Sequence, residues 1–308
     1  MGSSAARPPA PESVRFRGPW THRAVSANGI WLHVAECGVG PLVVLLHGFP
    51  EFWYAWRHQL VGLAERGYRA VAVDLRGYGD SDKPPRGYDL WTLAGDVAGL
   101  VPALGEDRAA IVGHGWGGVV GWTVAALHPR RVNALVAVAA PHPLAIRRAV
   151  AREPRGQGRA LLAVAGFQLP RWPERVLRVG DGVERSMRGW AGAEWSATDD
   201  FGDAVARYRA AARIPGAAYC AMEYYRWAVR SQLRAEGRRF AAAVARPAEA
   251  PVLGLHGADD PWLLPRTAAA SAPWAGERHT VEVLAGVGHF PHEERPTAVT
   301  ARIADFLG

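Results

Sequence analysis

The chain has 308 residues, of which 49% are hydrophobic and 21% charged, and this composition is typical of one soluble globular domain or a core domain with an insertion. Its net charge of +7 comes from scattered arginines, since Lys83 is the sole lysine, and without a tight basic run we expect no nucleic-acid partner. Cys37 and Cys220 provide neither a disulfide framework nor metal-ligand spacing, and no apolar run reaches membrane-spanning length, so we expect a cytoplasmic protein with no membrane partner.

The chain begins with MGSSAARPPAPESVRF, which is small, polar and rich in proline. This segment lacks the apolar core of a signal peptide. We therefore expect residues 1–20 to form a disordered lead-in.

Apolar runs and helical patterns then alternate along the chain. Strands are predicted at 29–36, 41–48, 68–77, 109–114 and 132–140, and helices at 56–67, at 91–105 and after Gly115. Alternation of this kind predicts a mostly parallel sheet with helices on both faces, an α/β fold.

The alternation stops near Leu144, and only helical stretches divided by Pro and Gly follow until Arg246. It resumes with strands at 251–257 and 279–286, a helix near 265–275 and a closing helix from Pro296. The sequence therefore predicts an α/β core of residues 21–143 and 247–308, interrupted by an all-helical cap of residues 144–246.

Five polar motifs follow the predicted strands: HGFPE (47–51), DLRGYGDSDKP (74–84), GHGWGG (113–118), GADDP (257–261) and GVGHFPHEERP (286–296). Ligands of such sheets bind at the carboxyl ends of the strands, so these motifs predict a shared site. The strand–turn–helix around GHGWGG is typical of a turn that holds a catalytic nucleophile. Its apex is Gly115, which has no side chain.

In their order and amino-acid sequence, these motifs resemble those of the α/β-hydrolase superfamily and, within it, of the epoxide hydrolases. Haloalkane dehalogenases are more distant relatives. The resemblance runs from Gly29 to the C-terminus. It implies the α/β-hydrolase fold with a helical cap and an apolar small molecule as substrate. We expect no cofactor and no metal, because the sequence shows no phosphate-binding loop and no cluster of ligand residues.

In the family, an aspartate at the turn apex attacks the epoxide and forms an ester, which a water activated by a His–Asp pair then hydrolyses. The resemblance assigns the histidine to His289 and its carboxylate partner to Asp260. The backbone N–H groups of Phe49 and Trp116 correspond to the oxyanion donors. The aspartate itself is replaced by Gly115.

Two tyrosines of the family's lid usually donate hydrogen bonds to the epoxide oxygen. Tyr225 in EYYR matches one of them, and the position that best matches the other is Ala163. Tyr225 also lies in an aromatic cluster with helical spacing, so it can equally belong to the core of the lid. Trp53 and Trp116 either line an apolar substrate pocket or pack in the core.

Other residues of the motifs leave alternatives open. His289 either takes part in the chemistry or is a structural histidine bound to a backbone carbonyl, and Asp259 competes with Asp260 as its partner. His47 and His114 are expected to brace loops through hydrogen bonds, and His292 is expected at the surface.

Two functions fit the sequence. In the first, a water in the space left at Gly115 is deprotonated by His289, poised by Asp260, and attacks an apolar substrate directly. In the second, the chain is a catalytically inactive pseudoenzyme that binds an apolar ligand or a protein partner. Both predict a monomer or a homodimer, and the presence of both His289 and Asp260 favours the first.

Overall fold

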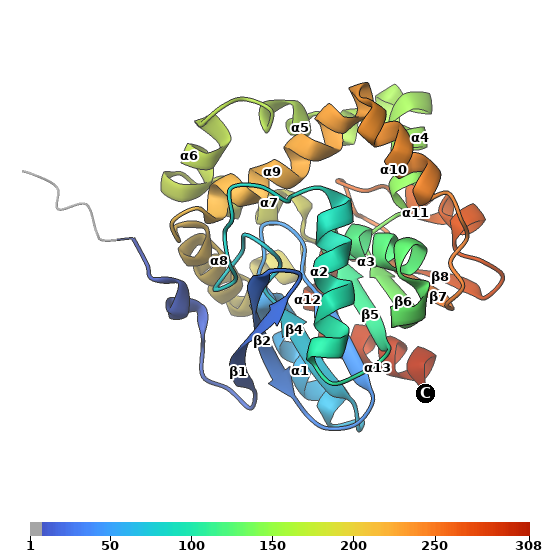
Figure 1. The fold of residues 1–308 in the computed structure, drawn as a ribbon. Coiled ribbons are helices and arrows are strands. Elements are labelled where there is room, and N and C mark those ends of the chain that lie inside the picture. Colours follow the sequence, from blue (N-terminus) through green and yellow to red (C-terminus); the bar gives the residue numbers. More distant parts are fainter. Residues whose placement is uncertain (1–7) are drawn as a thin grey trace, which may run out of the picture.

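Residues 8–308 are described by a computed structural model, in which one eight-stranded sheet has the order β1-β2-β4-β3-β5-β6-β7-β8 (Figure 1). The strands are β1 (Thr21–Ala27), β2 (Ile30–Cys37), β3 (Leu42–Leu46), β4 (Arg69–Val73), β5 (Ala109–His114), β6 (Val132–Val138), β7 (Val252–Gly257) and β8 (His279–Leu284). Strands β3 to β8 pair in parallel, whereas β1 and β2 are antiparallel additions at one edge. The predicted α/β fold with a mostly parallel sheet is confirmed.

Helices cover both faces of the sheet, which explains why the central strands are apolar throughout. On one face α2 (Leu90–Ala103) packs against α3 (Trp116–Leu127), and on the other α1 (Arg57–Ala64) packs against α13 (Pro296–Leu307). All five residues of β3 and all six of β5 are buried as a result. Two short helices, α11 (Pro265–Ala269) and α12 (Pro291–Glu294), complete this part of the chain.

Between β6 and β7 the described chain forms helices and turns but no strand. These helices are α4 (Pro143–Arg152), α5 (Ala163–Gly166), α6 (Trp172–Val179), α7 (Gly182–Trp190), α8 (Asp199–Ala212), α9 (Ala217–Arg230) and α10 (Ala235–Ala243). They lie together in the upper part and along the left side of Figure 1, and we refer to them as the cap. Its predicted limits, residues 144–246, stay a prediction.

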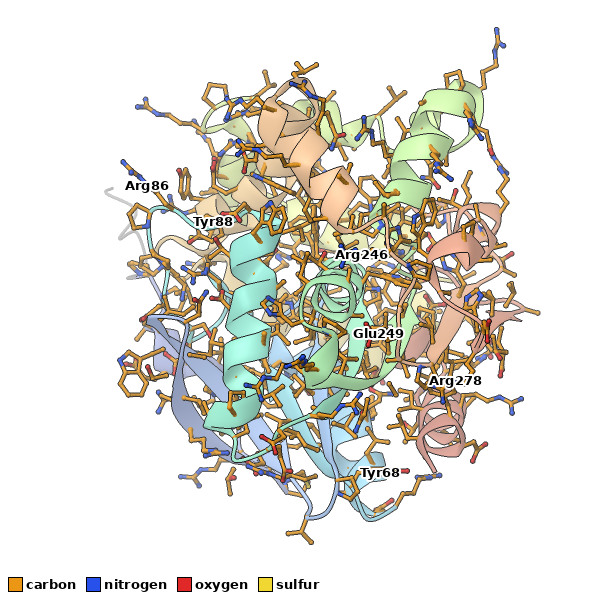
Figure 2. All side chains as sticks on the ribbon, turned by 45° about the vertical axis from the view of Figure 1, so that its right-hand side comes forward. Tyr68, Arg86, Tyr88, Arg246, Glu249 and Arg278 are labelled. Atoms are coloured by element: carbon orange, nitrogen blue, oxygen red, sulfur yellow. The ribbon has the colours of Figure 1, made fainter. Side chains whose placement is uncertain are left out.

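The cap lies over the carboxyl ends of the parallel strands. Tyr68 directly precedes β4 and Tyr88 follows it, and Figure 2 shows Tyr88 beside the cap and Tyr68 at the opposite end of the molecule. The Tyr88 hydroxyl lies 2.9 Å from Sγ of Cys220 in α9. The loops that carry the polar motifs therefore lie at the end of the sheet that faces the cap.

The N-terminal segment is more ordered than predicted. Residues Pro11–Val14 form a turn of 3₁₀ helix, and Val14 is buried, with its carbonyl accepting a hydrogen bond of 2.9 Å from Trp53 Nε1. Phe16 then packs its ring against Trp53. The expected disorder of residues 1–20 is therefore wrong for this segment, because its few apolar side chains cover an apolar surface; residues 1–7 lie outside the described part.

Two further elements differ from the sequence prediction. β1 was not predicted, since only Val25 and Ala27 of this edge strand are buried and its apolar pattern is weak. The helix expected near 265–275 ends at Ala269 and is followed by a 3₁₀ turn, Ala272–Trp274. Among the described helices, none combines the length and apolar character needed to cross a bilayer.

Candidate active site

The turn between β5 and α3 has Gly115 at its apex, with φ at +48° and ψ at −115°. This left-handed conformation favours glycine, because other residues meet steric strain there. Apart from the residues next to Gly115 in the chain, the atoms of residues 8–308 within 4 Å of a Cβ built on Gly115 are Gly48 Cα and His289 Nε2, each at the ordinary contact distance of 3.7 Å. A methyl-sized group at the apex therefore makes only ordinary van der Waals contacts with these two atoms.

His289 and Asp260, predicted as partners, are in direct contact. His289 Nδ1 lies 2.8 Å from Asp260 Oδ2, and both side chains are buried, whereas Asp259 is exposed. No hydrogen bond to His289 Nε2 is found within residues 8–308, and this nitrogen is the one that faces the Gly115 apex. The imidazole is thus oriented by one nitrogen and free to accept a proton at the other.

Asp260 is held as a carboxylate by its surroundings. Its Oδ1 accepts the backbone N–H groups of Trp262 and Leu263 at 2.8 and 2.9 Å, and His256 Nε2 lies 3.3 Å from Oδ2. Burial raises the pKa of Asp260, but the charges and hydrogen bonds of His289 and His256 outweigh it and hold that pKa below its usual range. The Asp260 carboxylate therefore stays negatively charged and stabilises an imidazolium at His289.

The cap holds the His289 loop in place. The backbone N–H of His289 donates to the carbonyl of Trp190, the last residue of α7, at 2.8 Å. Glu294 in α12 accepts N–H groups from Gly192, Gly288 and Phe290 at 3.0, 2.8 and 3.0 Å. Sequence reasoning missed Trp190 and Glu294, because no local pattern reveals a contact between segments about a hundred residues apart.

Aromatic rings cluster around Tyr225. The Tyr225 ring stands edge-on to Trp116 at 5.2 Å and to Phe49 at 5.4 Å, and Phe167 lies 4.9 Å from it. Burial raises the pKa of Tyr225, so its hydroxyl stays protonated. Neither Phe49 nor Trp116 donates its backbone N–H to a partner in the described part of the chain. Tyr225, Phe49 and Trp116 therefore lie together, and their roles as lid tyrosine and oxyanion donors stay a prediction.

Two predicted features are corrected here. Trp53 is no pocket residue: its ring packs against Trp20 and His22, and its indole nitrogen is bound to the N-terminal segment. Ala163 is exposed at the start of α5, and the side chain of this segment that contacts Tyr225 is Phe167. The site therefore has an apolar ring where a second lid hydroxyl was sought.

A buried network stands behind the site. Glu51 Oε2 lies 2.7 Å from His114 Nδ1 and accepts the N–H of Gly48 at 2.8 Å, while His114 Nε2 lies 2.8 Å from the carbonyl oxygen of His289. Burial lowers the pKa of His114, but the charge of Glu51 outweighs it and the net shift is upward. Protonated His114 donates from both nitrogens and so ties the 47–51 turn to the His289 loop. This bracing role of His114 agrees with the prediction. The role of Glu51 was not predicted, although Glu51 belongs to the HGFPE motif.

His292 belongs to this network and is fully buried, so its predicted surface position is wrong. Its ring packs 4.4 Å from that of Trp56, and its Nε2 lies 3.2 Å from Glu51 Oε1. Burial lowers the pKa of His292 to about 4, which keeps it neutral. The possible ligand atoms of Glu51, His114 and His292 lie within 4.8 Å of one another, as a metal would require, but two of them are already joined by the hydrogen bond described above.

The sequence profile described as the α/β hydrolase fold matches residues 41–296, most of the chain. The chain belongs to the α/β-hydrolase family. It is 34% identical over 287 residues to the AB hydrolase superfamily protein YfhM of Bacillus subtilis, an alignment that covers 92% of this chain and 96% of that protein. It is 33% identical over 290 residues to Epoxide hydrolase 3 of Xenopus tropicalis, covering 91% of this chain and 75% of the relative.

Solved structures agree with this assignment. The crystal structure of Epoxide Hydrolase A from Mycobacterium thermoresistibile has a TM-score of 0.76 with this α/β hydrolase at 30% sequence identity, and the match covers 94% of this chain and 98% of the other. This α/β hydrolase is therefore epoxide-hydrolase-like, as the sequence motifs predicted.

Proposed function

We propose that this α/β hydrolase hydrolyses an apolar epoxide in one step, with a water molecule in the space before Gly115 as the nucleophile. The observation that carries the proposal is the position of His289 Nε2, which has no hydrogen-bond partner in residues 8–308 and lies 3.7 Å from a Cβ built on Gly115. A general base must lie within hydrogen-bond reach of the proton that it removes. A water at the apex satisfies this condition.

In the proposed reaction the water donates one hydrogen to His289 Nε2 while its oxygen attacks an epoxide carbon. The carbon–oxygen bond of the ring breaks, and the departing oxygen takes the proton of the Tyr225 hydroxyl. Asp260 stabilises the imidazolium, which later returns its proton through solvent and so restores Tyr225. The products are a diol and the unchanged enzyme, and no ester with the protein forms.

The surroundings of the site favour an apolar substrate. The centroid of the Phe49 ring lies 6.0 Å from that of Phe167, 6.1 Å from that of Trp190 and 5.4 Å from that of Tyr225, and these rings carry no charge. Epoxide hydrolases among the sequence relatives support an epoxide as the reacting group. A cytoplasmic location and a monomeric or homodimeric state remain part of the proposal.

A single-turnover experiment in H₂¹⁸O, with enzyme in excess over an aryl epoxide, tests the mechanism. Direct attack by water places ¹⁸O in the diol formed in the first turnover. In Gly115→Asp the introduced carboxylate can attack instead, and the first diol then carries unlabelled oxygen. His289→Ala is expected to lower kcat by about 10²- to 10⁴-fold, the usual contribution of a general base.

Two outcomes contradict the proposal. Turnover that is insensitive to His289→Ala excludes the base. If the native protein shows no turnover and only Gly115→Asp is active, the alternative of a catalytically inactive pseudoenzyme is favoured. The absence of a side chain at Gly115 also favours this alternative.

A further inference from the structure

We infer that the space before Gly115 also binds a small carboxylate, formate in the simplest case, and that the bound anion opens an epoxide ring as a diffusible nucleophile. The inference rests on the proposed function for its substrate class, an apolar epoxide. It does not depend on water acting as the nucleophile.

The apex has room for such an anion. Among the described residues other than its chain neighbours, Gly48 Cα and His289 Nε2 are the atoms within 4 Å of a Cβ built on Gly115, both at 3.7 Å. Formate is the smallest carboxylate, with a single carbon and two oxygens. Pivalate carries three methyl groups beside its carboxylate and serves as the bulky comparison.

Hydrogen-bond donors for an anion border this space. Trp116 supplies the first N–H of α3, a 12-residue helix, and the first N–H groups of a helix point back toward its N-terminus and carry partial positive charge. Phe49 is the residue after Gly48, whose Cα borders the space, and it supplies the second N–H group. Neither N–H has a partner within the described residues.

A buried side chain independently points to a ligand here. His289 is 3% exposed, its Nδ1 is bound to Asp260, and its Nε2 faces the apex with no partner within residues 8–308. As an imidazolium, His289 donates from Nε2 to an anion while keeping its bond to Asp260. Binding of formate therefore takes up one proton.

A carboxylate uses these donors better than a water does. A water oxygen has two lone pairs, and if it accepts both N–H groups it keeps none for attack on carbon. Formate has two oxygens, so one accepts the N–H groups of Phe49 and Trp116 while the other keeps a free lone pair for the epoxide. The arrangement thus favours formate as a nucleophile held in place.

The proposed reaction with formate takes two steps. First, a formate oxygen bonds to an epoxide carbon, the ring carbon–oxygen bond breaks, and the departing oxygen takes the Tyr225 proton, giving a hydroxyalkyl formate ester. The His289 imidazolium releases its proton, which restores Tyr225. Then neutral His289 activates a water that attacks the ester carbonyl, and the acyl–oxygen bond breaks. Formate and the diol leave, and the net reaction is addition of water to the epoxide.

The test is turnover of an aryl epoxide at constant ionic strength with increasing [¹⁸O₂]formate in ordinary water. We expect a saturable rise of about ten-fold or more in kcat, as for a nucleophile held against its target, and a diol carrying one ¹⁸O from formate. Half-saturation should require less formate at pH 6 than at pH 8, because binding takes up a proton. Pivalate should give no rise.

Matched variants separate the site from general effects. Gly115→Ala fills the space and should abolish the response to formate, whereas Gly29→Ala carries a similar strain, at φ +78° in the distant β1–β2 turn, and should keep it. His289→Ala lacks both a donor to formate and the base of the second step, so it should convert the epoxide more slowly and release the formate ester in place of the diol, which mass spectrometry detects. If formate raises neither the turnover rate nor the ¹⁸O content of the diol, the inference is overturned, whether or not the native protein hydrolyses epoxides with water. If the diol carries ¹⁸O from formate and no turnover occurs without formate, the inference is supported. That second result contradicts only the mechanism in which water is the nucleophile.

Discussion

At the scale of single residues, the burial of His289 predicts how activity depends on pH. Burial lowers the pKa of His289 below 6.5 by more than the charge of Asp260 raises it. Only the neutral imidazole is a base, so kcat/KM for formate-free hydrolysis should rise with pH through an apparent pKa below 6.5 and level off above it. Burial raises the pKa of Tyr225 above 10, so its acid form persists and the plateau should extend past pH 9.

The pH–rate profile of kcat/KM checks this expectation, with Asp260→Asn as the comparison. Without the Asp260 charge the imidazolium is less favoured, so the rising limb should move to still lower pH while kcat falls. A rising limb centred above pH 7 would exclude His289 as the base in the environment described here.

Single residues also show the limits of sequence reasoning. His289 and Asp260 were predictable, because each follows a strand of a parallel sheet and such loops meet at one edge. Trp53 and His292 were not, because an apolar or polar pattern does not specify the partner across the fold. Trp53 packs against Trp20, and His292 is buried by Trp56 and Glu51, which precede it by more than two hundred residues.

At the scale of elements, one carboxylate joins α12 to the loop after α7. Glu294 accepts three N–H groups, one of them from Gly192 of the cap. Glu294→Gln turns an acceptor into an amide whose NH₂ group opposes these donors, and leaving buried donors unsatisfied costs about 1–3 kcal/mol. We expect a loss of this size in urea unfolding, and a lower kcat because the His289 loop loosens.

Glu194→Gln is the control for this prediction. Glu194 pairs with Arg295 in the same region, but its side chain is exposed, so no measurable loss of stability is expected. If Glu294→Gln unfolds at the same urea concentration as the native protein, the three hydrogen bonds do not hold the loop. The sheet and the existence of a helical cap were predictable from strand and helix patterns; this contact was not, since it joins residues far apart in the chain.

At the scale of the whole molecule, a buried arginine joins core and cap. Arg57, at the start of α1, contacts both carboxylate oxygens of Asp200 in α8 at 2.8 Å and also pairs with Glu293 in α12. Tyr208 of α8 donates its hydroxyl to Glu293 at 2.7 Å. Asp200 is half exposed, whereas Arg57 and Glu293 are buried, so the inner pair determines the energetics of this contact.

Arg57→Leu should therefore destabilise the protein by about 3–5 kcal/mol, because Glu293 remains buried without its counter-charge. The size of the loss should depend on pH. Burial raises the pKa of Glu293 to about 7 even though Arg57 lowers it, and without Arg57 this pKa rises further. An acid whose pKa is higher in the folded than in the unfolded state loses stability as pH rises between the two values. Arg57→Leu should thus cost more at pH 8 than at pH 5.

Urea unfolding at both pH values measures this effect, and Arg57→Leu combined with Glu293→Gln should recover most of the loss at pH 8, since no buried charge is then left unpaired. Arg185→Gln, which removes one partner of an exposed pair with Asp181 in the cap, should change stability by no more than about 0.5 kcal/mol. Equal losses at pH 5 and pH 8, without recovery in the double variant, would mean that Arg57 joins cap and core by packing of its side chain rather than by its charge.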